Sequence, residues 1–250
     1  MRRVAMVCGA VLLLAACGGG GSGSPAPAGS SAGSSAGGSA AAAEPMASCI
    51  SPEQQAAGGV AVKGSAGDQV DALVLGSGTT GVVMANMSDN DVCAWFPSAV
   101  LMASKGYRTA VFSYSGRQSA DADVLDVVAE LKRRGSTRIA LMGASKGGTA
   151  ALTAGKRAGA VAVVELSAPS SYEGMDAAAA VRALTVPTWF AVGEQDGEFV
   201  ASAHELYTAS PAATKHLEVV ASAAHGTGLL PDGGVQRMID EFLAKNAPPS

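Results

Sequence analysis

From residue 58 onward, short apolar runs alternate with stretches in which apolar residues recur every three or four positions. The runs have the length of buried strands, and the periodic stretches are typical of amphipathic helices. We predict strands at 81–87, 107–115, 137–143, 160–168, 186–193 and 215–222, and helices at 93–106, 119–135, 147–159, 175–184, 197–210 and around 235–243. Apolar strands that alternate with helices indicate an α/β fold, with a mainly parallel twisted sheet covered by helices on both faces.

Local signals refine several of these elements. Pro97 must lie in the first turn of its helix or break it. Ser119 or Asp121 can cap the start of the helix at 119–135, and Gly135 its end. Two weaker apolar segments, 58–64 and 69–76, are expected to form an antiparallel edge of the sheet.

The first sixteen residues have the features of a secretory signal. Arg2 and Arg3 precede an apolar stretch at 4–16 that is too short to span a bilayer as a helix. The segment "LAAC", at 14–17, resembles the lipobox of bacterial lipoproteins, which implies cleavage before Cys17 and lipid attachment to that cysteine. An ordinary secreted protein with a chance cysteine at the cleavage site is the alternative.

Residues 17–46 are almost wholly Gly, Ser, Ala and Pro after the cysteine, a composition that cannot bury enough apolar surface to order itself. We interpret them as a flexible tether, which leaves residues 47–250 as one domain with a sizeable core. The formal charge of −4 becomes −6 when Arg2 and Arg3 are removed with the signal. The sequence shows no basic patch, so nucleic acid is not expected as a partner.

The cysteines fit an oxidising compartment. The chain has four. Cys8 leaves with the signal and Cys17 would carry lipid, so Cys49 and Cys93 remain as a pair that we expect to form a disulfide. Metal binding is the rival interpretation, but two cysteines without a nearby histidine make a poor site.

The pattern G-x-S-x-G occurs three times, at 29–33, 33–37 and 143–147. The first two matches lie in the predicted tether, where a serine has no fixed base. Ser145 instead lies where a predicted strand meets a predicted helix. A sharp turn at this point would project its hydroxyl above the carboxyl edge of the sheet, where such sheets bind ligands. The small neighbours that such a turn requires are Gly143, Ala144, Gly147 and Gly148.

A nucleophilic serine needs a base, and the chain has three histidines. His204 lies within a predicted helix and is expected at its surface. His216 opens a predicted strand and is expected to face solvent. His225 follows the last strand in a glycine-containing loop, which makes it the candidate base.

The group that orients the base should follow the strand at 186–193. The loop there offers Glu194, Asp196 and Glu198. We choose Asp196, which precedes a glycine, with Glu194 as the second choice. A structural role for Asp196 as a helix N-cap is the alternative.

Together, "MGASKGGTAAL", "AVGEQD" and "AAHGTGLL" resemble the α/β-hydrolase superfamily, above all its dienelactone-hydrolase-like and small esterase branches, over residues 70–245. The resemblance implies the α/β-hydrolase fold and a Ser145–His225–Asp196 triad. True dienelactone hydrolases carry cysteine as nucleophile, so serine favours carboxylic ester hydrolysis. Fewer than twenty residues are available where relatives often insert a lid, so no large lid is expected.

The predicted oxyanion hole departs from this family. The backbone N–H of Lys146, at the start of a helix, can be one donor. The family usually has His-Gly after its third strand, where this chain has Asn86 and Met87. Ser88 would then be the second donor, unless the Met87 side chain shifts that role to Met87 itself. The side chain of Lys146 has no assigned role beyond solvation.

We therefore expect a lipid-anchored serine hydrolase outside the cytoplasm of a bacterium, acting on a small-molecule or polymer-borne ester. The mechanism needs no metal or organic cofactor. Acyl transfer or peptide hydrolysis on the same triad is one alternative. A surface lipoprotein that keeps the fold as a non-catalytic binding module is another.

Overall fold

The computed structural model describes residues 45–65, 67–232 and 234–249 of the chain. The predicted signal sequence, Cys17 and the predicted tether up to residue 44 lie outside the described residues. Among the helices that are described, none is long and apolar enough to cross a membrane.

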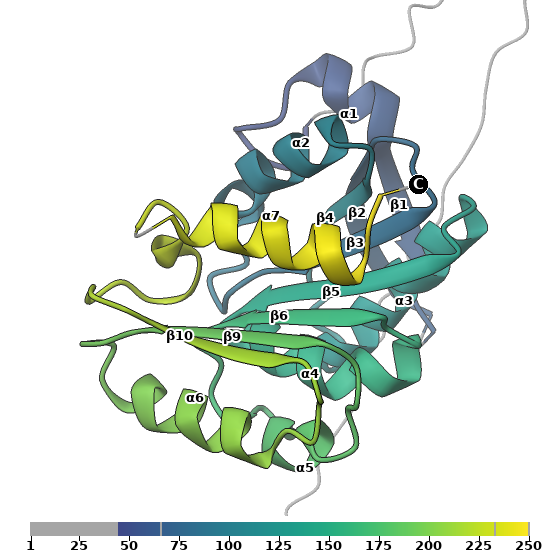
Figure 1. Cartoon of the computed structure of the whole chain (residues 1–250). Coiled ribbons are helices and arrows are strands. Elements are labelled where there is room, and N and C mark those ends of the chain that lie inside the picture. The colour runs from purple at the N-terminus through teal and green to yellow at the C-terminus, as the bar shows by residue number, and fades with distance from the viewer. Residues whose placement is uncertain (1–44, 66, 233, 250) are drawn as a thin grey trace, which may run out of the picture. The chain divides into compact units, whose positions relative to one another are not determined.

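Eight of the described strands form one twisted sheet, in the order β1-β2-β4-β3-β5-β6-β9-β10 (Figure 1). The bounds are β1 Gly59–Lys63, β2 Gln69–Leu75, β3 Thr80–Ala85, β4 Arg108–Ser113, β5 Arg138–Ala144, β6 Ala162–Leu166, β9 Thr188–Gly193 and β10 Lys215–Val220. β2 is antiparallel to β1 and to β4, and the other neighbours are parallel. The mainly parallel sheet and its antiparallel edge confirm the prediction.

Helices cover both faces of this sheet, as predicted. The α-helices are α1 Pro52–Gly58, α2 Phe96–Ser104, α3 Ala120–Arg133, α4 Lys146–Ala158, α5 Ala177–Val181, α6 Glu198–Ala209 and α7 Val235–Asn246, and the 3₁₀ helices are η1 Val92–Ala94 and η2 Gly226–Leu229. Helices α3, α4, α5 and α6 pack on one face, and α2 and α7 pack on the other (Figure 1). Alternate residues of one strand therefore enter two different cores, as Val83 and Met84 of β3 do.

The local signals in the sequence explain where several helices begin. Pro97 lies in the first turn of α2, where its missing N–H costs no hydrogen bond. Ser119 is the N-cap residue of α3, although its hydroxyl makes no capping hydrogen bond. Gly135 follows α3 with φ of 97°, a conformation that glycine adopts without strain.

Two segments differ from the prediction. Helix α1 was not expected; it begins with a capping box in which the Ser51 hydroxyl accepts from the Gln54 N–H. The predicted helix at 175–184 is shortened to α5, because the preceding residues form a hairpin of β7 Ser171–Tyr172 and β8 Met175–Asp176. Its turn residues, Glu173 and Gly174, have φ of 45° and 83°, as a tight hairpin turn requires.

Cys49 and Cys93 form the expected disulfide, with 5.7 Å between their Cα atoms. The bond joins the segment before α1 to η1, across a sequence separation of 44 residues. A cross-link over such a loop stabilises the fold by about 4 kcal/mol in the chain-entropy account.

Candidate active site

Ser145 lies in a strained turn between β5 and α4. Its φ of 51° and ψ of −120° place a non-glycine residue in a region that costs about 1–3 kcal/mol. The glycines around it are required by close backbone contacts. A Cβ on Gly143 would lie 2.0 Å from the Gly147 carbonyl oxygen, and one on Gly147 would lie 2.1 Å from that of Ala85. The turn thus has the tight packing that the sequence predicts for a nucleophile at this point.

His225 and Asp196 contact each other directly. The Nδ1 atom of His225 lies 3.0 Å from both carboxylate oxygens of Asp196. The Asp196 side chain is 7% exposed and the His225 side chain 33%. In the tautomer with its proton on Nδ1, the ring donates to Asp196 and keeps Nε2 free to accept a proton. The Phe199 ring packs on the imidazole with 4.2 Å between centroids.

The loop around His225, called the base loop because it carries the predicted base, lies against the turn that carries Ser145. A Cβ added on Gly226, the residue after His225, would lie 3.3 Å from the Ala144 Cβ, so the neighbours of His225 and Ser145 lie close together. Within the described residues, no hydrogen bond joins Ser145 to His225. Such bonds are often long without substrate and tighten in the complex.

The other candidate bases and acids lie elsewhere. His204 is exposed on α6, and His216, exposed on β10, lies 3.0 Å from Glu218. Glu194 is exposed, and among the described residues no hydrogen bond joins it to His225. Of the three carboxylates in the loop after β9, Asp196 is the one that pairs with His225. It precedes Gly197, which is the N-cap residue of α6.

The predicted oxyanion donors lie at the start of α4 and after β3. In the described part of the chain, the backbone N–H groups of Lys146, Met87 and Ser88 donate to no protein acceptor. Met87 lies against the base loop, because its sulfur accepts a hydrogen bond from the Thr227 hydroxyl at 3.7 Å. Ser88 is exposed.

The Lys146 side chain is not simply solvated, which corrects the sequence interpretation. It is 17% exposed, and its Nζ lies 2.8 Å from Glu173 in the β7–β8 turn. The same Nζ lies 4.9 Å from the Tyr114 ring centroid and 5.9 Å from that of Tyr172. Sequence reasoning missed this cluster because its members come from three distant segments.

Tyr114 connects that cluster to Asn86, which precedes the predicted oxyanion donors Met87 and Ser88. Its hydroxyl donates to the Asn86 carbonyl oxygen at 2.7 Å, and burial raises the pKa of the phenol well above its usual value. The Asn86 side-chain amide donates to the Phe112 carbonyl oxygen at 2.6 Å. The backbone carbonyl group and the side chain of Asn86 are therefore both held by hydrogen bonds, which fixes the chain just before Met87.

Two cavities border the candidate site. One, of about 300 Å³, is lined by Phe199, Pro169 and the start of the β7–β8 hairpin. The other, of about 290 Å³, lies between α2 and the residues after His225, and includes Thr227 and Leu101. Ser145, His225 and Asp196 line neither cavity; Phe199, which packs on the imidazole, lines the first, and Thr227, two residues after His225, lines the second.

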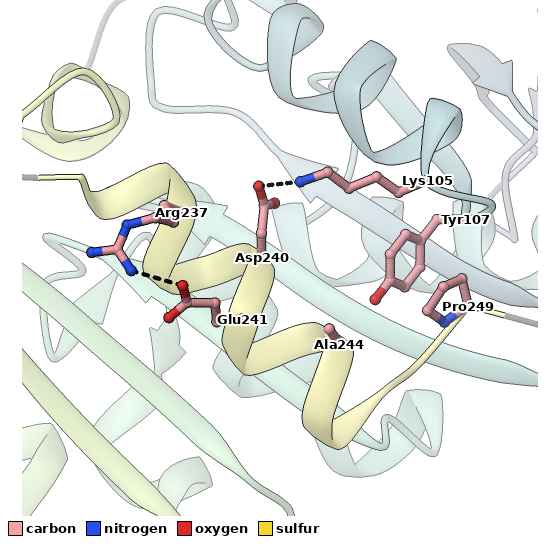
Figure 2. A pocket seen from close by; sticks show the side chains of 7 residues that line it. All are labelled: Lys105, Tyr107, Arg237, Asp240, Glu241, Ala244 and Pro249. Carbon is pink, nitrogen blue, oxygen red and sulfur yellow. Dashed lines mark hydrogen bonds and ion pairs between the residues drawn. The ribbon is translucent and has the colours of Figure 1, made fainter.

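A further cavity of about 300 Å³ lies away from these residues, beside α7 (Figure 2). Lys105, Asp240 and Tyr107 line it, and Lys105 and Asp240 form an ion pair at 2.6 Å. None of the predicted site residues lines this cavity.

Compared by sequence, the chain matches no family model and no curated protein. Compared by structure, it is similar to the esterase domain of a Rhodothermus marinus protein, with a TM-score of 0.63 and 15% identity over 75% of this chain and 97% of that one. It is also similar to a dienelactone hydrolase from Anabaena variabilis (TM-score 0.62, 17% identity, 75% and 96% covered). A thermophilic esterase from Thermogutta terrifontis gives a TM-score of 0.60 and 15% identity, with 75% and 98% covered.

These similarities and the strand order define the fold as the α/β-hydrolase fold, as the sequence resemblance implied. Between β6 and β9, the described chain forms the β7–β8 hairpin and α5, with no large lid.

Proposed function

We propose that the protein is a serine hydrolase of carboxylic esters, with Ser145 as nucleophile, His225 as base and Asp196 as the group that orients the base. The observation that carries the proposal is the His225–Asp196 hydrogen-bonded pair beside a serine in a strained strand-to-helix turn. The esterases among the structural neighbours support the same reaction class.

The chemistry proceeds in two halves. The Ser145 hydroxyl attacks the ester carbonyl carbon while His225 Nε2 takes its proton, and the carbonyl oxygen becomes an oxyanion. The bond to the alcohol then breaks, and His225 returns the proton to the leaving alcohol. Water repeats the sequence on the acyl-enzyme and releases the acid. The Asp196 carboxylate orients the ring and stabilises the imidazolium in both halves.

Backbone N–H groups stabilise the oxyanion. The Lys146 N–H is the first donor, because it stands at the N-terminus of α4, where the helix dipole favours negative charge. The second is the Met87 N–H or the Ser88 N–H, as the sequence left open. The contact of Met87 with the base loop supports the Met87 N–H as this second donor.

The substrate class follows from the shape of the site. Between β6 and β9 the described chain forms no large lid, so a water-soluble or polymer-borne ester suits the site better than a lipid droplet. We also propose that the protein works outside the cytoplasm, held to a bacterial membrane by lipid on Cys17. The Cys49–Cys93 disulfide supports an oxidising compartment.

Turnover of an ester panel tests the activity. The protein should release p-nitrophenol from acyl esters and leave peptide p-nitroanilides intact, which separates an esterase from a peptidase. Ser145→Ala should lose this activity, while Ser104→Ala, at the exposed end of α2, should keep it. A binding module without catalysis would cleave none of the esters.

A further inference from the structure

The turn that follows β6 contacts both the nucleophile segment and the base loop. The Leu166 carbonyl oxygen accepts from the Ser145 N–H at 2.8 Å. The Ser167 hydroxyl oxygen accepts from the Gly226 N–H at 3.0 Å, beside His225. Adjacent residues of one turn therefore fix the backbone of the nucleophile and the backbone next to the base.

Ser167 holds this position in a strained conformation. It is fully buried, and its φ is 53°, which a non-glycine residue adopts at a cost of about 1–3 kcal/mol. Its own N–H donates to the Ala191 carbonyl oxygen at 2.8 Å. The Thr149 hydroxyl donates to the Pro169 carbonyl oxygen at 2.8 Å and ties the end of the turn to α4. A strained turn persists only where its surroundings hold it.

The Glu165 carboxyl group supplies one of these restraints. Glu165 lies in β6 and is fully buried, and its Oε2 accepts from the Ala168 N–H at 2.8 Å. Its Oε1 is buried, and within the described residues it has no hydrogen-bond partner. The Glu165 side chain thus links the two ends of the turn. It begins at the residue before Leu166 and accepts a hydrogen bond from the residue after Ser167.

No charged side chain in the described structure compensates a charge on Glu165. Its partners across the sheet are Gly143 and Phe190, and Gly148 of α4 packs against Ala168. None of these three can ionise. Burial raises the pKa of Glu165 to about 8, opposed by the Ala168 N–H, so the carboxyl group is protonated at neutral pH.

We propose that Glu165 is a positioning residue, whose buried neutral carboxyl group holds the turn at Ser167 and thereby sets the base loop against the nucleophile. The inference rests on the proposed hydrolase function for its effect on turnover. When Glu165 loses its proton, an uncompensated charge remains in an apolar core, and the turn must move or admit water. The resulting displacement of His225 lowers kcat more than it changes KM.

The kinetic test compares wild type with Glu165→Gln, whose amide oxygen can still accept from Ala168 but does not titrate. We expect kcat of wild type on a neutral ester to fall about tenfold between pH 7 and pH 9, following the protonated fraction, with KM changing less than twofold. Glu165→Gln should stay within about threefold of wild type at pH 7 and lose the alkaline fall. The exposed control Glu241→Gln, on α7, should keep it. An identical alkaline fall in Glu165→Gln would overturn the proposal.

A second test does not depend on turnover. Amide hydrogen exchange of Gly226 reports the hydrogen bond to Ser167, so its protection factor should fall about tenfold in Ser167→Ala at pH 7. In wild type it should also fall between pH 7 and pH 9, and in Glu165→Gln it should not. If Gly226 protection responds to neither change, the proposal is wrong. If protection behaves as expected but wild type cleaves no ester, the positioning claim stands and the proposed hydrolase function fails.

Discussion

Replacing Glu165 by glutamine should change how the stability of the protein depends on pH. In the unfolded chain, Glu165 ionises at its ordinary pKa of 4.5, whereas burial raises the pKa to about 8 in the folded protein. Between these values the unfolded state has released the proton that the folded state keeps. The contribution of Glu165 to the free energy of unfolding is fully present below pH 4.5 and is lost as pH rises to about 8.

The size of the effect follows from this interval. Each pH unit within it corresponds to about 1.4 kcal/mol, so from pH 5 to pH 8 wild type loses about 4 kcal/mol through this group. Relaxation around a buried charge lowers such penalties, so about 2 to about 4 kcal/mol is the expected range. Glutamine does not titrate and should show no such loss. Asp123, whose pKa is also raised by burial, is present in both proteins and cancels from the difference.

Urea unfolding followed by tryptophan fluorescence measures the difference, because Trp95 and Trp189 are both buried. Between pH 5 and pH 8, the free energy of unfolding of Glu165→Gln relative to wild type should rise by about 2 to about 4 kcal/mol. Glu241→Gln, an exposed replacement on α7, is the control and should give a flat difference. A difference for Glu165→Gln that is equally flat would refute the buried, protonated carboxyl group.

Three further changes have defined outcomes. Replacing Cys49 and Cys93 by serine should lower the free energy of unfolding by about 4 kcal/mol, measured in urea, and leave kcat of the folded protein nearly unchanged; a stability equal to wild type would contradict a closed disulfide. Glu173→Ala should be less stable than Glu173→Gly by about 1 kcal/mol in the same assay, because glycine adopts positive φ freely; the reverse order would contradict the strained turn. Asp196→Asn should lower kcat on p-nitrophenyl esters by about three to four orders of magnitude, and a loss below tenfold would exclude Asp196 as the partner of His225.

The pattern of hydrophobic residues was enough to predict the layers of the fold. Residues 82–85 and 139–142 are apolar throughout because β3 and β5 are buried on both faces, and that property is visible in a single sequence. The β7–β8 hairpin was missed because its turn uses Glu173 at positive φ, and glutamate is not a residue that signals such a turn.

Contacts within the candidate site could be predicted where chain order and local turn chemistry determine them. The choice of Asp196 over Glu194 rested on loop position, and the structure places Asp196, not Glu194, against His225. Contacts among distant segments left no local trace, as for Lys146 with Glu173. Glu165 did leave a signal, since an acidic residue within the apolar segment 160–168 needs a partner or a proton, and only the structure shows which it has.

Covalent labelling tests the central claim most directly. The protein is incubated with a fluorophosphonate, which reacts with serines activated by a neighbouring base, and the adduct is located by peptide mass spectrometry. We expect one adduct, on Ser145, that is absent in Ser145→Ala, strongly reduced in His225→Ala and unchanged in Ser104→Ala. Absence of labelling in a folded wild-type protein, or an adduct on another serine that persists in Ser145→Ala, would contradict the assignment of Ser145 as the nucleophile.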